Sequence, residues 1–256
     1  MMRVIMPSAQ EAAPCWGGHR RRGHDLRLRG LTSDPTTTRR LYGRRAGHAL
    51  RQGQAALVED LLPRVSVPSG PLNAPTLFHD DRALWFEIGF GSGEHLAVQA
   101  AAHPDIGLIG AEPFLNGVVG ALAQIEAHAL ANVRLHMGDA LDILECLPDA
   151  SLARAFLLHP DPWPKARHAK RRFVNPGPLD LLAAKLVPGA ELRIGTDHPV
   201  YVRWTLMQMA VRRDFAWQAT QPADWQTRPA DWPQTRYEAK ARRLGHEVWY
   251  LRYVRV

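Results

Sequence analysis

Short apolar runs alternate with amphipathic segments from residue 83 onward, and this alternation is the feature that most restricts the fold. The runs suit strands that are buried on both faces of a sheet, and they cover residues 83–90, 107–111, 133–137, 152–158 and 191–195. Residues 114–130, 178–187 and 199–211 carry apolar side chains at helical spacing. Repeated strands and helices predict an α/β fold, a mostly parallel sheet with helices on both faces. Residues 248–254 predict a last strand at an edge or antiparallel to the others.

Positive charge gathers at the two flanks of the chain, although the total for the 256 residues is only +7. Residues 1–51 carry a net +8, residues 52–150 a net −10 and residues 151–256 a net +9. An acidic centre between basic flanks is expected of a polyanion-binding protein with a separate small-molecule site. From the charges alone, a solvated surface with a disordered basic tail is the favoured interpretation.

The patterns divide the chain into three regions. Residues 1–38 are basic and have no sustained period, which predicts a disordered arm. Residues 39–75 are expected to form a basic extension with a short helix over residues 48–62, closed by Pro63. The alternating pattern then occupies the core domain, residues 76–256.

The composition sets several classes of protein aside. Cys15 and Cys146 lie far apart and have no metal-ligand grouping around them, so neither a disulfide framework nor a zinc site is expected. The N-terminus lacks the charge order of a secretory signal, and no apolar run approaches the roughly 20 residues of a membrane span. We therefore expect a cytoplasmic protein with no metal and no membrane partner, while monomer and homodimer both stay open.

A glycine-rich loop follows the first predicted strand. Its three glycines, Gly89, Gly91 and Gly93, permit a tight turn and the close approach of a ligand. A dinucleotide fingerprint would have its third glycine at the position of Glu94. Glu87 precedes the turn, and a carboxylate there repels phosphate and attracts a cation. The loop therefore suits S-adenosyl-L-methionine, with its sulfonium and ammonium groups, better than NAD.

Acidic residues stand at the ends of three successive predicted strands: Glu87, Glu112 and Asp139. The carboxylate of Glu112 can accept both hydrogen bonds of a ribose diol, and Asp139 is placed to accept from an adenine amino group. Any one of these acids could simply cap a helix or face water. Three in succession favour a cofactor site.

The loop after the fourth predicted strand combines an acid, three prolines and a basic run. The prolines around Asp161 prevent a helix and keep the loop extended. Residues 165–172 then hold five positive charges and no negative one. Beside a strand-end acid, such a run is more consistent with a phosphate clamp than with a merely solvated surface.

Six segments in this order resemble the tRNA (guanine-N7)-methyltransferase family: EIGFGSG, GAEP, NVRLHMGDA, DPWPK with its basic continuation, GTDHPVY and TRYE. The resemblance covers residues from about 39 to the end. It implies the Rossmann-like class I methyltransferase fold with a seven-stranded, mostly parallel sheet and an antiparallel last strand. It also implies S-adenosyl-L-methionine as methyl donor and N7 of a guanine in the tRNA variable loop as acceptor.

The resemblance also implies roles for individual residues. Asp161 matches the proposed catalytic position. The cofactor positions are Glu87, Gly89, Gly91, Gly93, Glu112, Asp139 and Asp161. The substrate positions are Lys165, Asp197, Thr235, Arg236, Tyr237 and Glu238. The basic residues expected to contact RNA are Arg167, Lys170, Arg171 and Arg172.

One segment occurs twice near the end of the chain, as PADWQTR at 222–228 and PADWPQTR at 229–236. Two copies are too few for a solenoid, so the repeat is interpreted as a loop duplication. Only the second copy is followed by Tyr237 and Glu238, which settles its match to the family motif. The chain departs from the family pattern at Ser92, at His159 and at the pair His198–Pro199.

The expected chemistry needs no general base, because guanine N7 has an in-plane lone pair and no proton. Alignment and electrostatics should dominate, with Asp161 either stabilising the ring as it gains positive charge or fixing the position of the base. Glu238 is suited to accept from guanine N1–H and its amino group. Two alternatives remain at this stage: an NAD-dependent oxidoreductase on a related sheet, and a non-catalytic RNA-binding protein.

Overall fold

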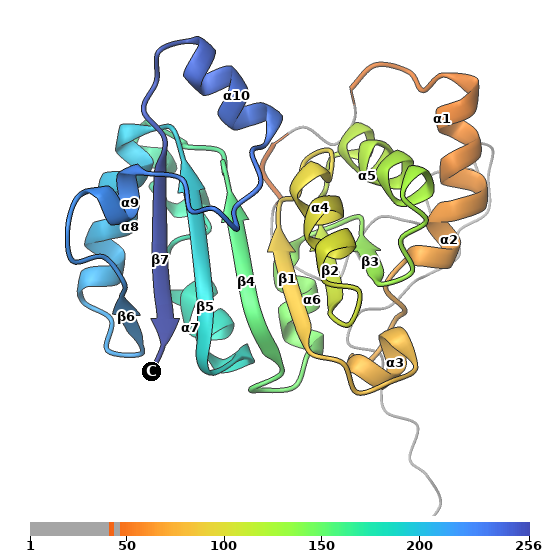
Figure 1. Ribbon diagram of the computed structural model, residues 1–256, viewed down its shortest axis with the longest axis horizontal. Coiled ribbons are helices and arrows are strands. Elements are labelled where there is room, and N and C mark those ends of the chain that lie inside the picture. Colours follow the sequence, from red (N-terminus) through yellow and green to blue (C-terminus); the bar gives the residue numbers. More distant parts are fainter. Residues whose placement is uncertain (1–40, 44–46) are drawn as a thin grey trace, which may run out of the picture.

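The computed structural model describes residues 41–43 and 47–256, in which seven strands form one sheet of order β3-β2-β1-β4-β5-β7-β6. The strands are β1 (Leu84–Ile88), β2 (Gly107–Ala111), β3 (Val133–His136), β4 (Leu152–Leu158), β5 (Leu186–Thr196), β6 (Phe215–Trp217) and β7 (Trp249–Arg255). Strands β1 to β5 are parallel, and β7 pairs antiparallel with both β5 and β6. The predicted sheet and its antiparallel last strand are confirmed (Figure 1).

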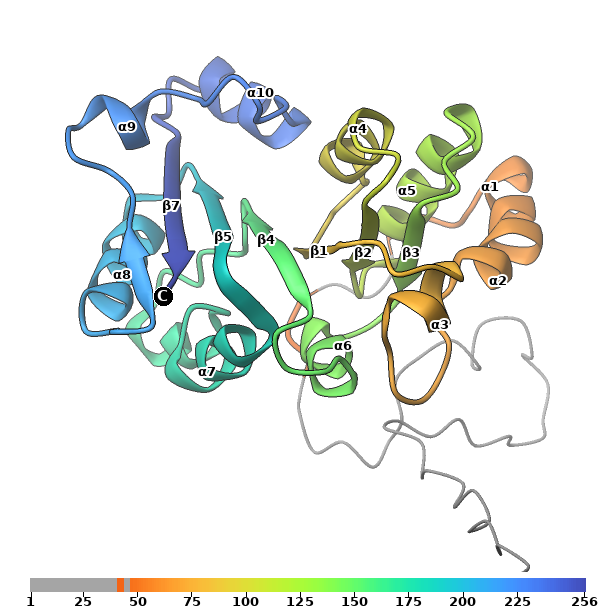
Figure 2. The same cartoon turned by 60° about the horizontal axis from the view of Figure 1, so that its bottom comes forward.

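Helices cover both faces of this sheet (Figure 2). One face carries α4 (Glu94–Ala102) and α5 (Leu115–Ala127), and the other carries α6 (Ala140–Cys146), α7 (Pro176–Lys185) and α8 (Pro199–Ala210). The side chains of β1 alternate between two cores. Phe86 and Ile88 belong to the core under α6 to α8, while Trp85 belongs to the core under α4 and α5. Side chains of successive strand residues point to opposite faces, so a fully apolar strand supplies both cores.

The N-terminal helices lie against α5 at the β3 edge of the sheet (Figure 1). They are α1 (Gln52–Ala56), the π-helical turn η1 (Leu57–Leu61) and α2 (Leu62–Val65). The amide of Val67 then donates to the carbonyl of Leu135 in β3, at 2.9 Å. Contrary to prediction, Pro63 does not close the helix, because it lies in the first turn of α2, just after the wider π turn, where a missing amide proton is tolerated.

Other element boundaries also differ from the predicted ones. Strand β5 begins at Leu186, inside the predicted helix 178–187, and so is longer than predicted. The remaining short elements are α3 (Ala74–Phe78), the 3₁₀ helix η2 (Ala166–Arg171), α9 (Ala223–Gln226) and α10 (Arg236–Arg243). The predicted arm, residues 1–38, lies outside the described residues. Within them, no helix is long and apolar enough to cross a membrane.

The parallel strands bring their carboxyl ends to one edge. Ile88 of β1 is level with Ala111 of β2 and Leu157 of β4, and Leu158 is level with Gly195 of β5. The loops after these strands therefore meet at this edge, which is where open α/β sheets bind their ligands. Helix α10 lies beyond the same edge (Figure 1).

Candidate active site

A cavity of about 690 Å³ opens at the carboxyl edge of the sheet. Six residues predicted for the cofactor, substrate or RNA line it: Gly89, Gly91, Glu112, Asp161, Arg171 and Tyr237. They come from the loops after β1, β2 and β4, from η2 and from α10. The fold thus brings together around one cavity residues that lie as far apart in the sequence as Gly89 and Tyr237.

The glycine loop approaches α10 closely at Gly91. The backbone of Gly91 has φ +58°, a left-handed conformation that favours glycine. A Cβ built at this position would lie 3.0 Å from Cε2 of Tyr237. Gly91 therefore allows the backbone to turn here and leaves room for the ring of Tyr237 beside the cavity.

Glu112 fixes this loop from the neighbouring strand. Its Oε2 accepts from the amide of Gly91 and its Oε1 accepts from the amide of Phe114, each at 2.9 Å. Burial raises the pKa of this carboxyl, although the two amide hydrogen bonds act in the opposite direction. Each carboxylate oxygen has a second lone pair, so Glu112 has acceptor capacity left for a ribose diol.

Two predicted cofactor acids lie elsewhere. Glu87 is 3% exposed, and its Oε2 lies 2.8 Å from Nδ1 of His95 on α4. Asp139 caps α6 by accepting from the amide of Leu141 at 3.0 Å. Neither residue lines the cavity, nor does Gly93, which forms the N-cap of α4.

Asp161 is exposed at the cavity, in a loop that Arg172 holds from inside the protein. Arg172 donates from Nε to the carbonyl of Pro162 at 3.0 Å and from Nη2 to the carbonyl of Trp163 at 2.8 Å. The side chain is only 5% exposed, and its guanidinium also lies over the ring of Trp204. Arg172 was predicted to contact RNA, and in this structure two of its donor atoms bind the loop that carries Asp161.

The other basic residues of this run lie further out. Lys165, Arg167 and Lys170 are exposed on or next to η2. The guanidinium carbon of Arg171 lies 4.8 Å from the ring centroid of Trp163 and 4.3 Å from that of Tyr42. Arg171 thus joins the segment before α1 to the loop of Asp161.

Asp197 follows β5 and faces two histidines. Its Oδ1 lies 3.4 Å from Nδ1 of His159 and its Oδ2 lies 3.5 Å from Nδ1 of His246. Burial lowers the pKa of His159, with the nearby Asp197 acting in the opposite direction. Burial would raise the pKa of Asp197, but the hydrogen bond with His159 and other contacts lower it below its usual range.

Helix α10 begins at the predicted substrate segment. The hydroxyl of Thr235 caps the helix by accepting from the amide of Glu238 at 3.2 Å. The ring of Tyr237 stacks on His159 with centroids 6.2 Å apart, and Arg236 approaches Glu94 of α4 at 3.3 Å. The start of α10 is thus held over the glycine loop.

Glu238 points into the protein, since it is only 1% exposed and does not line the cavity. Its Oε1 accepts from Tyr250 at 2.7 Å and from Arg242 at 2.9 Å, and lies 3.4 Å from Nε of Arg228. Burial, together with Glu238, raises the pKa of Tyr250 to about 12. Glu238 was predicted to contact guanine, and in this structure its carboxylate binds Tyr250 and Arg242.

The sequence reasoning missed several residues of the cavity. Phe114 lines it two residues after Glu112, where its position just after a strand was an available signal. Tyr42 also lines it, but only its place in the basic extension pointed toward a site. Among the described residues, no group of three or more His, Cys, Asp or Glu side chains could hold a metal ion.

Comparisons with known proteins agree on one family. Residues 81–251 match the model of a family described as putative methyltransferase. A tRNA (guanine-N7)-methyltransferase of Zymomonas mobilis subsp. mobilis is 62% identical over 87% of this chain and 97% of that protein. One of Sphingopyxis alaskensis is 58% identical, with the same coverage.

Among solved structures, an rRNA methylase from Streptococcus thermophilus is similar with a TM-score of 0.47 and 13% identity, covering 69% of this chain and 89% of that one. The family assignment comes from the sequence matches, in which the aligned region covers most of this chain and most of each relative. The chain belongs to the tRNA (guanine-N7)-methyltransferase family.

Proposed function

We propose that this protein transfers a methyl group from S-adenosyl-L-methionine to N7 of a guanine in the variable loop of tRNA. The observation that carries the proposal is the cavity itself, where Glu112, Asp161 and Tyr237 surround one space beside an exposed basic helix. The relatives are named tRNA (guanine-N7)-methyltransferases, which gives tRNA guanine N7 as the methyl acceptor for those proteins. The proposed partner is therefore tRNA.

The residues at the cavity fit this cofactor. A side chain at Gly91 would meet Tyr237, so the glycine leaves room that a Cβ would fill. Glu112 offers acceptor oxygens for the ribose, and its negative charge, with that of Asp161, suits a cationic ligand. When bound, S-adenosyl-L-methionine supplies an electrophilic methyl group. The NAD alternative is not supported, because the family is one of methyltransferases.

Guanine N7 attacks with its own lone pair, so the protein has to align the base and stabilise charge. The N7–methyl bond forms as the methyl–sulfur bond breaks, and the positive charge passes to the guanine ring. Asp161 is exposed at the cavity and can stabilise the charged ring. Tyr237 is 42% exposed, so its ring is accessible for contact with an unstacked base.

The tRNA backbone is proposed to lie along η2. Lys165, Arg167 and Lys170 are exposed there, immediately after the loop that carries Asp161. Phosphate contacts of this kind fix the register of a nucleic acid without reading its sequence. The basic run would thus hold the tRNA while a single base enters the cavity.

The test is nucleoside mass spectrometry of unmodified tRNA after incubation with the protein and methyl donor, followed by mapping of the modified position. The wild-type protein should form N7-methylguanosine in the variable loop. Asp161→Ala should lower the rate by about 100-fold or more, the size expected when a stabilising charge is lost.

Asp81→Ala is the matched control, because that residue is exposed at the opposite edge of the sheet, just before β1 begins. It should leave the rate unchanged. Wild-type protein that binds tRNA but forms no methylated guanosine would instead establish a non-catalytic RNA-binding protein. Near-normal product with Asp161→Ala would remove this residue from the mechanism.

A further inference from the structure

The two copies of the duplicated segment place the same residue in different surroundings. Asp224 of the first copy bonds within its own turn, accepting from the amides of Thr220 and Gln221 at 2.8 and 3.1 Å. Asp231 of the second copy instead reaches the sheet, where its Oδ2 accepts from Nη2 of Arg193 at 2.6 Å. Among the residues that the structure describes, it is the second copy whose aspartate bonds to a distant strand.

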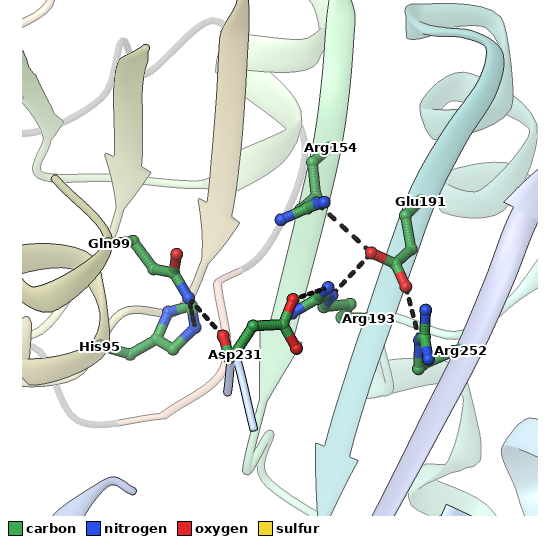
Figure 3. Close-up of polar contacts among 7 residues, drawn as sticks. All are labelled: His95, Gln99, Arg154, Glu191, Arg193, Asp231 and Arg252. Atoms are coloured by element: carbon green, nitrogen blue, oxygen red, sulfur yellow. Dashed lines mark hydrogen bonds and ion pairs between the residues drawn. The ribbon is translucent and has the colours of Figure 1, made fainter. Parts of the chain in front are cut away.

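Asp231 also bonds to α4 through its backbone (Figure 3). Its carbonyl accepts from Nε2 of Gln99 at 3.3 Å. Gln99 lies 3.3 Å from Nε2 of His95, whose Nδ1 lies 2.8 Å from Glu87 at the end of β1. His95 and Gln99 are almost fully buried, so this chain of polar groups runs inside the protein.

On the strands, the groups that Asp231 meets carry much positive charge (Figure 3). Glu191 contacts Arg193 at 2.7 Å, Arg252 at 2.6 Å and Arg154 at 3.4 Å. Arg193 is 2% exposed, and its Nη1 has no hydrogen-bond partner among the described residues. Three guanidinium groups therefore share two carboxylates, and Asp231 supplies one of the two.

Asp231 lies five residues before the start of α10. Trp232, next to Asp231, is 2% exposed and meets Tyr250 of β7 edge-on, with ring centroids 5.4 Å apart. Thr235 then caps α10, and Tyr237 reaches the cavity beside Gly91. Asp231 and Trp232 thus attach the loop to the sheet shortly before Tyr237.

We propose that Asp231 is a positioning residue for methyl transfer to tRNA: by joining Arg193 of β5 to Gln99 of α4, it holds α10 so that Tyr237 faces the cavity. The inference rests on the proposed function for its kinetic part only. The position of α10 can be measured without any turnover.

The first measurement is amide hydrogen exchange of full-length Asp231→Ala and Asp224→Ala proteins. The two variants remove the same carboxylate from equivalent places in the two copies, so Asp224→Ala is the matched control. Asp231→Ala should speed exchange over residues 232–243 and leave β1 and β4 protected, whereas Asp224→Ala should not change residues 232–243. Unchanged exchange of α10 in Asp231→Ala would overturn the proposal, whatever reaction the protein catalyses.

The second measurement is steady-state kinetics with unmodified tRNA. Asp231→Ala should raise the KM for tRNA about ten-fold, the size expected for one charge-assisted hydrogen bond, with little change in kcat. Its affinity for S-adenosyl-L-methionine should match that of the wild type. Asp231→Glu keeps a carboxylate at this partly exposed position and should therefore have a KM for tRNA close to that of the wild type. A decrease in kcat without a change in KM for Asp231→Ala would contradict the assignment.

Asp231→Asn guards against a variant that fails to fold, because it keeps the shape of the side chain and removes only its charge. It should show the same exchange and KM effects at reduced size. If the wild type itself forms no methylated guanosine, the proposed function fails and the exchange result still decides the position of α10. Kinetics of Asp231→Ala equal to those of Asp224→Ala, with an active wild type, would overturn the inference alone.

Discussion

At the scale of single residues, two arginines of one basic run have different environments. Arg167 is exposed on η2, whereas Arg172 is buried and donates to the carbonyls of Pro162 and Trp163. Sequence reasoning gave both the same role, because a charge pattern does not show which members of a run turn inward. Their substitution should separate a contact with tRNA from support of the catalytic loop.

Arg172→Ala should lower the free energy of unfolding by about 1–3 kcal/mol, because two loop carbonyls lose a charged donor. It should also slow methylation at saturating tRNA, since the Asp161 loop is no longer held. Arg167→Ala should leave the free energy of unfolding unchanged and raise the KM for tRNA, less so at high salt. Chemical denaturation and initial rates at two salt concentrations test this, and identical behaviour of the two variants would contradict it.

Residue positions were predictable where strand ends decide them and were missed where a side-chain direction decides them. Glu112 and Asp161 follow parallel strands, so their meeting at one edge follows from the fold. Glu87 precedes Ile88 in β1, and it is Ile88 that lines the cavity while Glu87 faces His95. Glu238 turns inward, where the hydroxyl of Tyr250 in β7 donates to its carboxylate, a contact between segments that no local pattern records.

At the scale of elements, the close approach of the glycine loop and α10 gives a second test. Gly91→Ala puts a side chain at a φ of +58° and within 3.0 Å of Tyr237. The backbone strain should cost about 1–2 kcal/mol of the free energy of unfolding. The contact with Tyr237 should in addition displace the start of α10, and so raise the KM for tRNA.

Gly189→Ala is the control for strain alone. Gly189 has φ +85°, and a Cβ there would meet no described atom within 4 Å. Both variants should therefore lose stability in thermal denaturation, but only Gly91→Ala should change the kinetics. A kinetic defect of the same size in Gly189→Ala would show that general destabilisation, and not the position of α10, is responsible.

The long elements were predictable and the short ones were not. The parallel strands and helices α5 and α8 show clear periodicity, so their approximate positions followed from the sequence. Strand β6 spans only Phe215–Trp217, too short for an alternating pattern, and it depends on pairing with β7. The helix through Pro63 continues because of a π turn, which sequence patterns do not indicate.

At the scale of the whole molecule, ion pairs make the stability of the protein depend on pH. Burial would raise the pKa of Glu191, but Arg252 and Arg193 lower it below the usual value of 4.5. A carboxyl whose folded pKa is lowered contributes stability above its unfolded pKa and loses it as the pH falls through the folded value. Asp197, Asp214 and Asp231 have lowered pKa values as well, whereas Glu112, with a raised pKa, acts in the opposite sense.

We therefore expect the free energy of unfolding to fall as the pH drops below about 4.5, the range in which these carboxylates begin to bind protons in the unfolded chain. Urea denaturation at a series of pH values measures it. Glu191→Gln should lower stability at neutral pH, because three guanidinium groups lose their shared carboxylate, and should flatten the acid dependence. An unchanged pH dependence in this variant would show that Glu191 does not contribute to the loss of stability in acid.

The duplicated segment also has an evolutionary consequence. A second copy relieves one of the two from selection, and the structure indicates which: within the described part of the chain, Asp224 bonds to its own turn, while Asp231 bonds to buried Arg193. Among close descendants of this sequence, substitutions should therefore accumulate at Asp224 faster than at Asp231. The age of the duplication could then be judged from how far the first copy has drifted.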